Sequence, residues 1–254
     1  FSTDRWAVVG ESGLFSDPFY SPGTDFISMA NTFTCDLILR DLINEDIIFR
    51  THFYAKIFRA LYDNWMPVYV NQYSLWGNSQ IMVVKILWDW ATYWSINTLL
   101  FINNGLTNID FMLKLVSGPT ALMNKYGELS LQMQRLFKEW EPYDTSNLTD
   151  RYIDPFDLDF LKNFQEDIVE KQISIEELDR KLIDNFYILE HFAAEIFRLI
   201  SNMVHGTSMD ITVDPYSMTL DTNNRVKSKN SKMMKRNDYV VEELKNLWLY
   251  KYPA

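Results

Sequence analysis

Apolar residues recur along most of this chain at spacings of three and four positions, the period of one helix face. The most regular run comprises Leu178, Leu182, Phe186, Leu189, Ala193, Ile196 and Ile200. Ser174, with Glu177 three residues later, forms a capping box before the run, and Gly206 is a typical helix stop after it. The pattern therefore predicts one long helix between Ser174 and Gly206.

Similar patterns predict further helices before and after this one. We expect them at Pro22 to about Leu42, Asn44 to about Gly77 with a kink or an end at Pro67, Ser79–Asn103, 107–141 with a break at Gly118-Pro119, and Val240–Leu249. On the second of these, one face would carry Phe49, Phe53, Ile57, Ala60 and Leu61. Residues 142–157 are interpreted as a connection, and residues 207–238 as irregular.

The first residues differ from this pattern. Trp6–Gly10 is a short apolar run ending in glycine, which predicts a buried strand of the parallel type. Residues 10–23 hold three Gly, two Pro and three Ser and predict a structured loop. Pro22 and Asp25 suit the first turn of the helix that follows. The predicted fold is mainly α, with a strand–loop–helix piece over residues 1–43 and a large helical domain over 44–254.

Composition narrows the possible functions. The net charge of −10 disfavours a nucleic-acid scaffold, because phosphate binding needs clustered Lys and Arg. The single cysteine, Cys35, excludes an internal disulfide and a multi-Cys metal site, and we expect a cytoplasmic protein. Lys85 and Asp89 interrupt the apolar run at 81–102, which favours a buried helix over a membrane span. The abundant aromatic residues, 8 Trp, 14 Tyr and 17 Phe, are interpreted as core packing.

The loop after the predicted strand carries the most specific chemistry. Glu11 directly follows Gly10, and a carboxylate at the end of a parallel strand can accept hydrogen bonds from ligand hydroxyls. Gly13 allows close approach of backbone to a ligand. Pro18 stiffens the loop, and Gly23 opens a helix whose first N–H groups favour negative charge.

This order of residues resembles the second flavin-binding motif of the FAD monooxygenase and flavin-dependent halogenase superfamily, over roughly residues 6–40. The resemblance implies that FAD is the cofactor and that Gly10, Glu11, Gly13, Asp17, Pro18, Gly23 and Thr24 bind it. Glu11 would then bind the ribityl chain, and Asp17-Pro18 would lie against the isoalloxazine ring. The N–H groups of Gly23 and Thr24 would face the pyrimidine edge of that ring. No catalytic residue is assigned.

Three positions depart from the family pattern. Glu11 stands where the family has Asp, Pro22 replaces the Ser or Thr that precedes the helix in many halogenases, and Tyr20 replaces the catalytic Glu of tryptophan halogenases. Pro22 has no N–H, and Tyr20 cannot act as a carboxylate at neutral pH. The sequence therefore favours a flavin function more than halogenation.

The chain lacks the GxGxxG fingerprint that binds the FAD pyrophosphate, and it begins with Phe1 rather than Met. We expect a missing N-terminal FAD-binding half and an inactive fragment. The whole enzyme would act on a small organic substrate, a class that includes aromatic compounds. A flavin reductase or reduced nicotinamide would be the electron source. The alternative is a non-catalytic helical interaction module that retains a relic flavin loop.

Other motifs give weaker signals. Gly10-Glu11-Ser12-Gly13-Leu14 lacks the second glycine of a hydrolase elbow, so Ser12 is a poor nucleophile candidate. The three histidines have no metal-ligand spacing, and we expect His191 to be structural and His205 to cap a helix. A basic segment with six Lys and Arg residues at Arg225–Arg236 is interpreted as a solvated loop, with an acidic partner or anionic surface as the alternative. Asn147 begins a glycosylation sequon.

Overall fold

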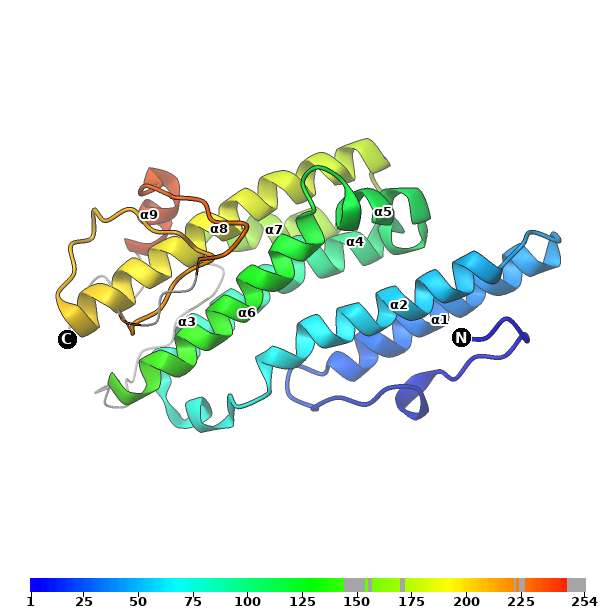
Figure 1. The fold of residues 1–254 in the computed structure, drawn as a ribbon, viewed down its shortest axis with the longest axis horizontal. Coiled ribbons are helices and arrows are strands. Elements are labelled where there is room, and N and C mark those ends of the chain that lie inside the picture. Colours follow the sequence, from blue (N-terminus) through cyan, green and yellow to red (C-terminus); the bar gives the residue numbers. More distant parts are fainter. Residues whose placement is uncertain (144–153, 155–156, 170–171, 222, 224–226, 246–254) are drawn as a thin grey trace.

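The computed structural model describes residues 1–143, 154, 157–169, 172–221, 223 and 227–245 (Figure 1). Its α-helices are α1 (Pro22–Leu42), α2 (Ile48–Trp65), α3 (Ser79–Thr92), α4 (Leu99–Ile102), α5 (Ile109–Ser117), α6 (Leu122–Trp140), α7 (Asp159–Val169), α8 (Ile175–His205) and α9 (Asp238–Lys245). Within the described residues the strand-like pairing is limited to an antiparallel bridge between Val213 and Met234. The prediction of a mainly α fold is therefore confirmed.

Side chains that cap the helix starts explain where several helices begin. The Ser174 hydroxyl accepts the N–H of Glu177 at 3.2 Å, as the capping box predicts. Asn78 and Asn108 accept N–H groups at the starts of α3 and α5, each at 3.0 Å. Gly206 ends α8 in the left-handed conformation, with φ of 63°.

A wider, π-helical segment, Tyr93–Thr98, joins α3 to α4 in the continuous helix predicted for this region. Asn185 of α8 donates its side-chain N–H to the backbone carbonyl of Ser95 at 3.1 Å. A side chain that takes a carbonyl from the helical ladder favours such a local widening. Segments of this kind often occur at functional sites, and this one contributes to the site described below.

The core forms where α3, α6 and α8 pack against one another, with Trp88, Trp140 and Phe192 among its buried side chains. Figure 1 shows α1 and α2 running side by side as a pair beside these helices. Buried residues of α1, including Phe33, belong to the same apolar cluster as the later helices. The division of the chain at residue 43 therefore stays a prediction.

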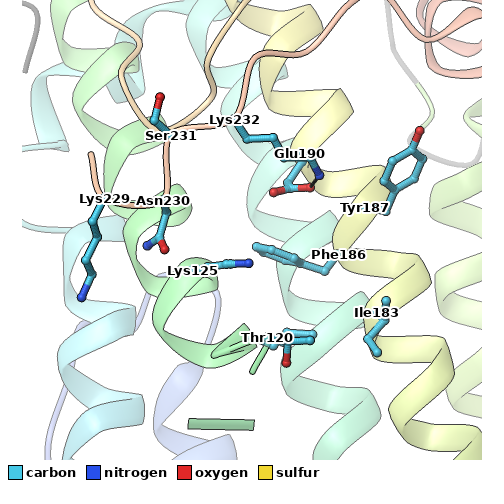
Figure 2. A pocket seen from close by; sticks show the side chains of 11 residues that line it. Thr120, Lys125, Ile183, Phe186, Tyr187, Glu190, Lys229, Asn230, Ser231 and Lys232 are labelled. Atoms are coloured by element: carbon cyan, nitrogen blue, oxygen red, sulfur yellow. Dashed lines mark hydrogen bonds and ion pairs between the residues drawn. The ribbon is translucent and has the colours of Figure 1, made fainter. Parts of the chain in front are cut away.

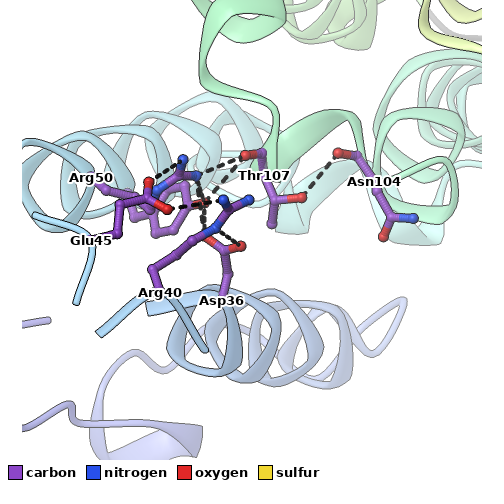
Figure 3. A network of polar contacts seen from close by, with 7 residues as sticks. Asp36, Arg40, Glu45, Arg50, Asn104 and Thr107 are labelled. Carbon is purple, nitrogen blue, oxygen red and sulfur yellow. Dashed lines mark hydrogen bonds and ion pairs between the residues drawn. The ribbon is translucent and has the colours of Figure 1, made fainter. Parts of the chain in front are cut away.

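An ion-pair network joins the end of α1 to the start of α2 (Figure 3). Asp36 accepts hydrogen bonds from the Tyr54 hydroxyl at 2.5 Å and from Arg50 at 3.1 Å. Arg40 bonds to Glu45 at 3.0 Å in the connection between the helices. Both Arg50 and Tyr54 also donate to the carbonyl of Thr107, so the network holds the α1–α2 pair against the turn before α5.

One prediction about local structure is wrong, and a second is wrong in part. Trp6–Gly10 is neither a strand nor buried: the side chains of Trp6 and Val8 are 58% and 47% exposed. A strand needs a neighbour to pair with, and the described residues offer none here. The face predicted for α2 is wrong only in part. Ile57 and Leu61 are buried as predicted, whereas Phe49 and Ala60 are exposed and Tyr54 is buried instead.

Other predictions concern residues that lie partly outside the described ranges. This is so for most of the connection at 142–157, including Asn147, and for the end of the helix predicted to reach Leu249. None of the helices in the described ranges combines the length and apolar character needed to cross a membrane.

Candidate functional site

The loop predicted from the sequence to bind a ligand lies along the α1–α2 pair, drawn in dark blue in Figure 1. It begins with a 3-10 turn at Gly10–Ser12 and reaches α1 at Pro22. Its residues differ greatly in exposure, and the exposed ones include most of those to which the flavin motif assigns a role.

The first predicted ligand residues face solvent. Glu11 is exposed, and its carboxylate has no hydrogen-bond partner among the described residues. Gly10 has a φ of +69°, and a Cβ added there would meet no atom within 4 Å. Gly13 differs, because an added Cβ would lie 2.8 Å from the carbonyl oxygen of Val8. The small size of Gly13 therefore serves the chain's own turn.

The middle of the loop consists of two tight turns. The Asp17 carboxylate accepts the N–H of Phe19 at 2.8 Å, and the N–H of Ser21 donates to the Pro18 carbonyl at 2.9 Å. Tyr20 and Ser21 then follow with φ of 65° and 56°, a left-handed conformation that residues other than glycine rarely adopt. Such backbone persists only where surrounding contacts hold it.

Tyrosine hydroxyls from the helical region provide those contacts. Tyr62 donates to the carbonyl of Phe15 at 3.2 Å, and Tyr69 donates to the carbonyl of Phe19 at 2.8 Å. The indole N–H of Trp65 in turn donates to the Tyr69 hydroxyl at 2.9 Å. These bonds join the loop to α2 and to the turn that follows it.

Aromatic rings complete the support of the loop. Phe19 stacks on Trp76 with ring centroids 4.2 Å apart, and the ring of Tyr20 lies 4.3 Å from that of Phe19. The helical region therefore supports the loop from Phe15 onward, while Glu11, Ser12 and Gly13 are exposed.

The start of α1 is open at its N-terminal end. Ser21 provides no side-chain cap, and the N–H of Gly23 has no hydrogen-bond partner among the described residues. A Cβ added at Gly23 would meet no atom within 4 Å. Thr24 departs from the expectation, because its N–H and hydroxyl both donate to the carbonyl of Ser21, at 3.2 and 2.7 Å. The N–H of Gly23 is therefore open at this helix start, whereas that of Thr24 is not.

A small cavity of about 30 Å³ lies beside this helix start, lined by Pro22, Asp25, Phe26, Met29, Leu61, Trp65, Tyr93 and Asn97. Tyr93, from the π-helical segment, donates its hydroxyl to the Asp25 carboxylate at 2.9 Å. Burial raises the pKa of the Asp25 carboxyl group, and the hydrogen bond from Tyr93 opposes that rise. Burial and the nearby Asp25 raise the pKa of Tyr93 to about 12. The Tyr93 hydroxyl therefore keeps its proton at neutral pH and donates it to Asp25 in the hydrogen bond at this helix start.

A buried polar cluster lies beneath the loop. The Lys85 ammonium donates to Asp89 at 2.8 Å and to Gln134 at 2.6 Å, and Gln134 donates to the second oxygen of Asp89 at 2.7 Å. The side chains of Lys85 and Asp89 are 0% and 2% exposed. Burial raises the pKa of Asp89, against the opposing effect of Lys85.

Tyr20 connects the loop to this cluster. Its hydroxyl is buried without a partner at hydrogen-bond geometry, yet it lies close enough to Asp89 for that charge, together with burial, to raise the pKa of Tyr20. A residue at the loop's most strained point thus reaches the polar centre of the helical core.

Sequence reasoning missed Tyr62, Tyr69 and Tyr93 as members of the site. Their partners, Phe15 and Phe19 of the loop and Asp25 of α1, lie 47 to 68 positions away in the chain. The high tyrosine content is the one sequence signal for these contacts, and by itself it predicts core packing. That interpretation accounts for the rings but not for the hydroxyl groups.

The weaker candidates remain separate from this site. Ser12 is exposed, and its hydroxyl has no histidine partner among the described residues. His205 bonds to the carbonyl of Leu220 at 3.1 Å at the end of α8, while His191 is buried within that helix. The described residues contain no group of three or more His, Cys, Asp or Glu that could hold a metal ion.

Comparison with known proteins adds no relative: no family model, curated protein or solved structure matches this chain.

Proposed function

We propose that the chain is the C-terminal portion of an FAD-dependent oxidoreductase of the monooxygenase and halogenase type. In this proposal residues 1–43 complete the flavin site and the helices from residue 44 onward cover its substrate side. The supporting observation is the flavin-like motif itself, whose Gly10, Glu11 and Gly23 stand accessible at the open start of α1. The Glu11 carboxylate and the Gly23 N–H have no partner among the described residues, so both are free to bind a ligand.

The exposed groups are compatible with a flavin. Glu11 has a carboxylate without a protein partner, which suits the hydroxyl groups of a ribityl chain. The Gly23 N–H, at the positive end of a 21-residue helix, suits an atom that gains negative charge. Gly13 and Thr24 fit less well as direct ligands, because the chain's own turns use them.

The bound flavin would supply the redox chemistry, and this chain would supply position and electrostatics. Glu11 would orient the cofactor, and Gly23 would favour negative charge on the ring. Asp25 and Tyr93 would hold a proton beside the ring. The tyrosines beneath the loop would keep its strained backbone in place. The helical region would enclose a small organic substrate, and aromatic compounds belong to this substrate class.

The proposal also requires a partner. The chain has no pyrophosphate-binding GxGxxG motif, so a nucleotide-binding half must supply one. Trp6, Val9 and Phe15 are 58%, 38% and 64% exposed, and such apolar side chains near the loop suit contact with that half. A flavin reductase or reduced nicotinamide would provide electrons.

The test is to purify the 254-residue chain alone and joined to its natural nucleotide-binding half. The proposal predicts stoichiometric bound FAD in the joined protein and weak or no binding to the chain alone. A joined protein without flavin would instead support the alternative, a helical interaction module with a relic loop. Stoichiometric flavin on the chain alone would show that its binding determinants lie elsewhere.

A further inference from the structure

A second cavity, of about 520 Å³, lies between α6, α8 and the irregular segment 207–237 (Figure 2). Its lining residues are Thr120, Leu122, Lys125, Ile183, Phe186, Tyr187, Glu190, Lys229, Asn230, Ser231 and Lys232. It shares no lining residue with the loop at the start of α1. Its volume lies in the range that encloses small organic ligands, roughly 300–1,000 Å³.

The walls of this cavity are held in place by polar contacts, most of them partly buried. Glu128 of α6 accepts hydrogen bonds from Ser228 and Asn230, and Arg198 of α8 donates to the carbonyls of Ile211 and Met234. Figure 1 shows the segment crossing α8 and α6 accordingly. The cavity is therefore preformed, which reduces the entropic cost of binding a ligand.

The charge of the lining is positive although the chain as a whole carries −10. Three lysines line the cavity with one glutamate, and Glu190 is already paired with Lys232. Lys125 and Lys229 have no ion-pair partner among the described residues. The first turn of α6 also begins at the cavity, and Ala121 before it provides no side-chain cap, which adds partial positive charge.

One wall is apolar and aromatic. Phe186 and Tyr187 of α8 line it together with Ile183, and Figure 2 shows the amino group of the half-buried Lys125 pointing toward Phe186. Lys232 turns instead to Glu190. A free ammonium beside an aromatic wall suits a ligand that joins an anionic group to a flat apolar body.

We propose that this cavity binds a small organic anion, with its carboxylate on Lys125 and its flat body against Phe186 and Tyr187. The polar side chain of Thr120 also lines the cavity and suits a further hydrogen bond to the carboxylate, whereas the Asn230 amide already donates to Glu128. This site is independent of the flavin proposal, and either can fail without the other.

The experiment is calorimetric titration of the 254-residue chain with naphthalene-2-carboxylate, and with naphthalene-2-carboxamide as the neutral analogue. We expect saturable binding of the carboxylate and much weaker binding of the amide. Lys125→Glu should weaken carboxylate binding at least about tenfold, as expected for the loss of a hydrogen bond between charged groups. Tyr187→Ala should weaken it less. Tyr187 is 49% exposed, so its removal should leave the fold intact.

Lys235→Glu is the matched control, because Lys235 is an exposed lysine of the segment 207–237 and does not line the cavity. It changes the net charge as Lys125→Glu does, and we expect binding within about twofold of the unsubstituted chain. Absence of saturable binding would overturn the proposal. Equal affinity for the amide, or equal loss in both lysine variants, would also overturn it, because neither is compatible with an anion held by Lys125.

Discussion

The hydroxyl group of Tyr69 donates a hydrogen bond of 2.8 Å to the backbone carbonyl of Phe19, one residue before the left-handed Tyr20. The two residues are 50 positions apart in the chain. This bond shows how the conformation of the loop at residues 10–23 depends on the helical region, which follows it in sequence. The loop and the helices beneath it therefore form one structural unit.

Replacing Tyr69 with Phe should loosen the loop. The substitution removes the bond to Phe19 and leaves the Trp65 indole N–H without its acceptor, so we expect a loss of about 1–3 kcal/mol in the free energy of unfolding. Urea unfolding measures the loss, and amide exchange should become faster at residues 15–21. Tyr73→Phe is the control, because Tyr73 is 54% exposed and its hydroxyl has no described protein partner. Equal effects of both substitutions would contradict the proposed role of Tyr69.

Two glycines of the loop should respond oppositely to alanine. Gly13→Ala places a methyl group 2.8 Å from the Val8 carbonyl, and we expect a loss of about 1–3 kcal/mol. Gly23→Ala meets no neighbouring atom, and the reduced flexibility of the unfolded chain should leave stability unchanged or raised by up to about 1 kcal/mol. Thermal unfolding of both variants checks this. A larger loss for Gly23→Ala would show that the helix start is more crowded than the structure indicates.

The carboxyl group of Asp25 should make stability depend on pH. Its folded-state pKa is raised from 3.8, mainly by burial, so the folded chain binds the proton more tightly than the unfolded chain. Stability from this group is complete below pH 3.8 and is lost as pH rises through the raised pKa. Asp25→Asn should therefore gain stability relative to the unsubstituted chain as pH rises above 3.8.

The measurement is urea unfolding at a series of pH values, with Asp4→Asn as the exposed control. A difference between Asp25→Asn and the unsubstituted chain that stays constant or shrinks with rising pH would contradict the raised pKa.

The buried pair of Lys85 and Asp89 should be sensitive to the loss of one partner. Lys85→Met leaves the Asp89 carboxylate buried without its cation, and we expect a loss of about 3–5 kcal/mol. The double substitution Lys85→Met with Asp89→Leu removes both charges and should recover much of that loss. Guanidinium unfolding compares the three chains. A double variant as unstable as Lys85→Met alone would show that packing, not charge, dominates at this position.

Much of the fold could be predicted from the sequence because its helices have local signals. The Ser174 capping box, Gly206 and the Pro22 start each act within one turn of helix, and the structure has them as predicted. The strand at Trp6–Gly10 was predicted wrongly for the opposite reason. A strand depends on a partner elsewhere, and an apolar run of this length does not show whether a partner exists.

The site could be predicted only in part. Glu11 and Gly23 could be named because the motif is contiguous in sequence. The hydroxyl groups of Tyr62 and Tyr69 reach the loop, and that of Tyr93 reaches Asp25 of α1, only after these parts of the chain have folded together. The lysine-lined cavity likewise joins Lys125 to residues about 60 and 100 positions later. Spatial relations of this kind leave no local pattern.

The central claim is that residues 10–24 hold a flavin, and the affinity of the joined protein for FAD tests it most directly. Glu11→Ala should weaken FAD binding by about one to two orders of magnitude, the value of a hydrogen bond to a charged group. Gly23→Val should weaken binding and shift the flavin reduction potential, because its side chain blocks the N–H at the start of α1. Ser12→Ala, on the same exposed turn, is the control and should have a milder effect than either. Full flavin occupancy and an unchanged potential in both the Glu11→Ala and the Gly23→Val variants would contradict the account.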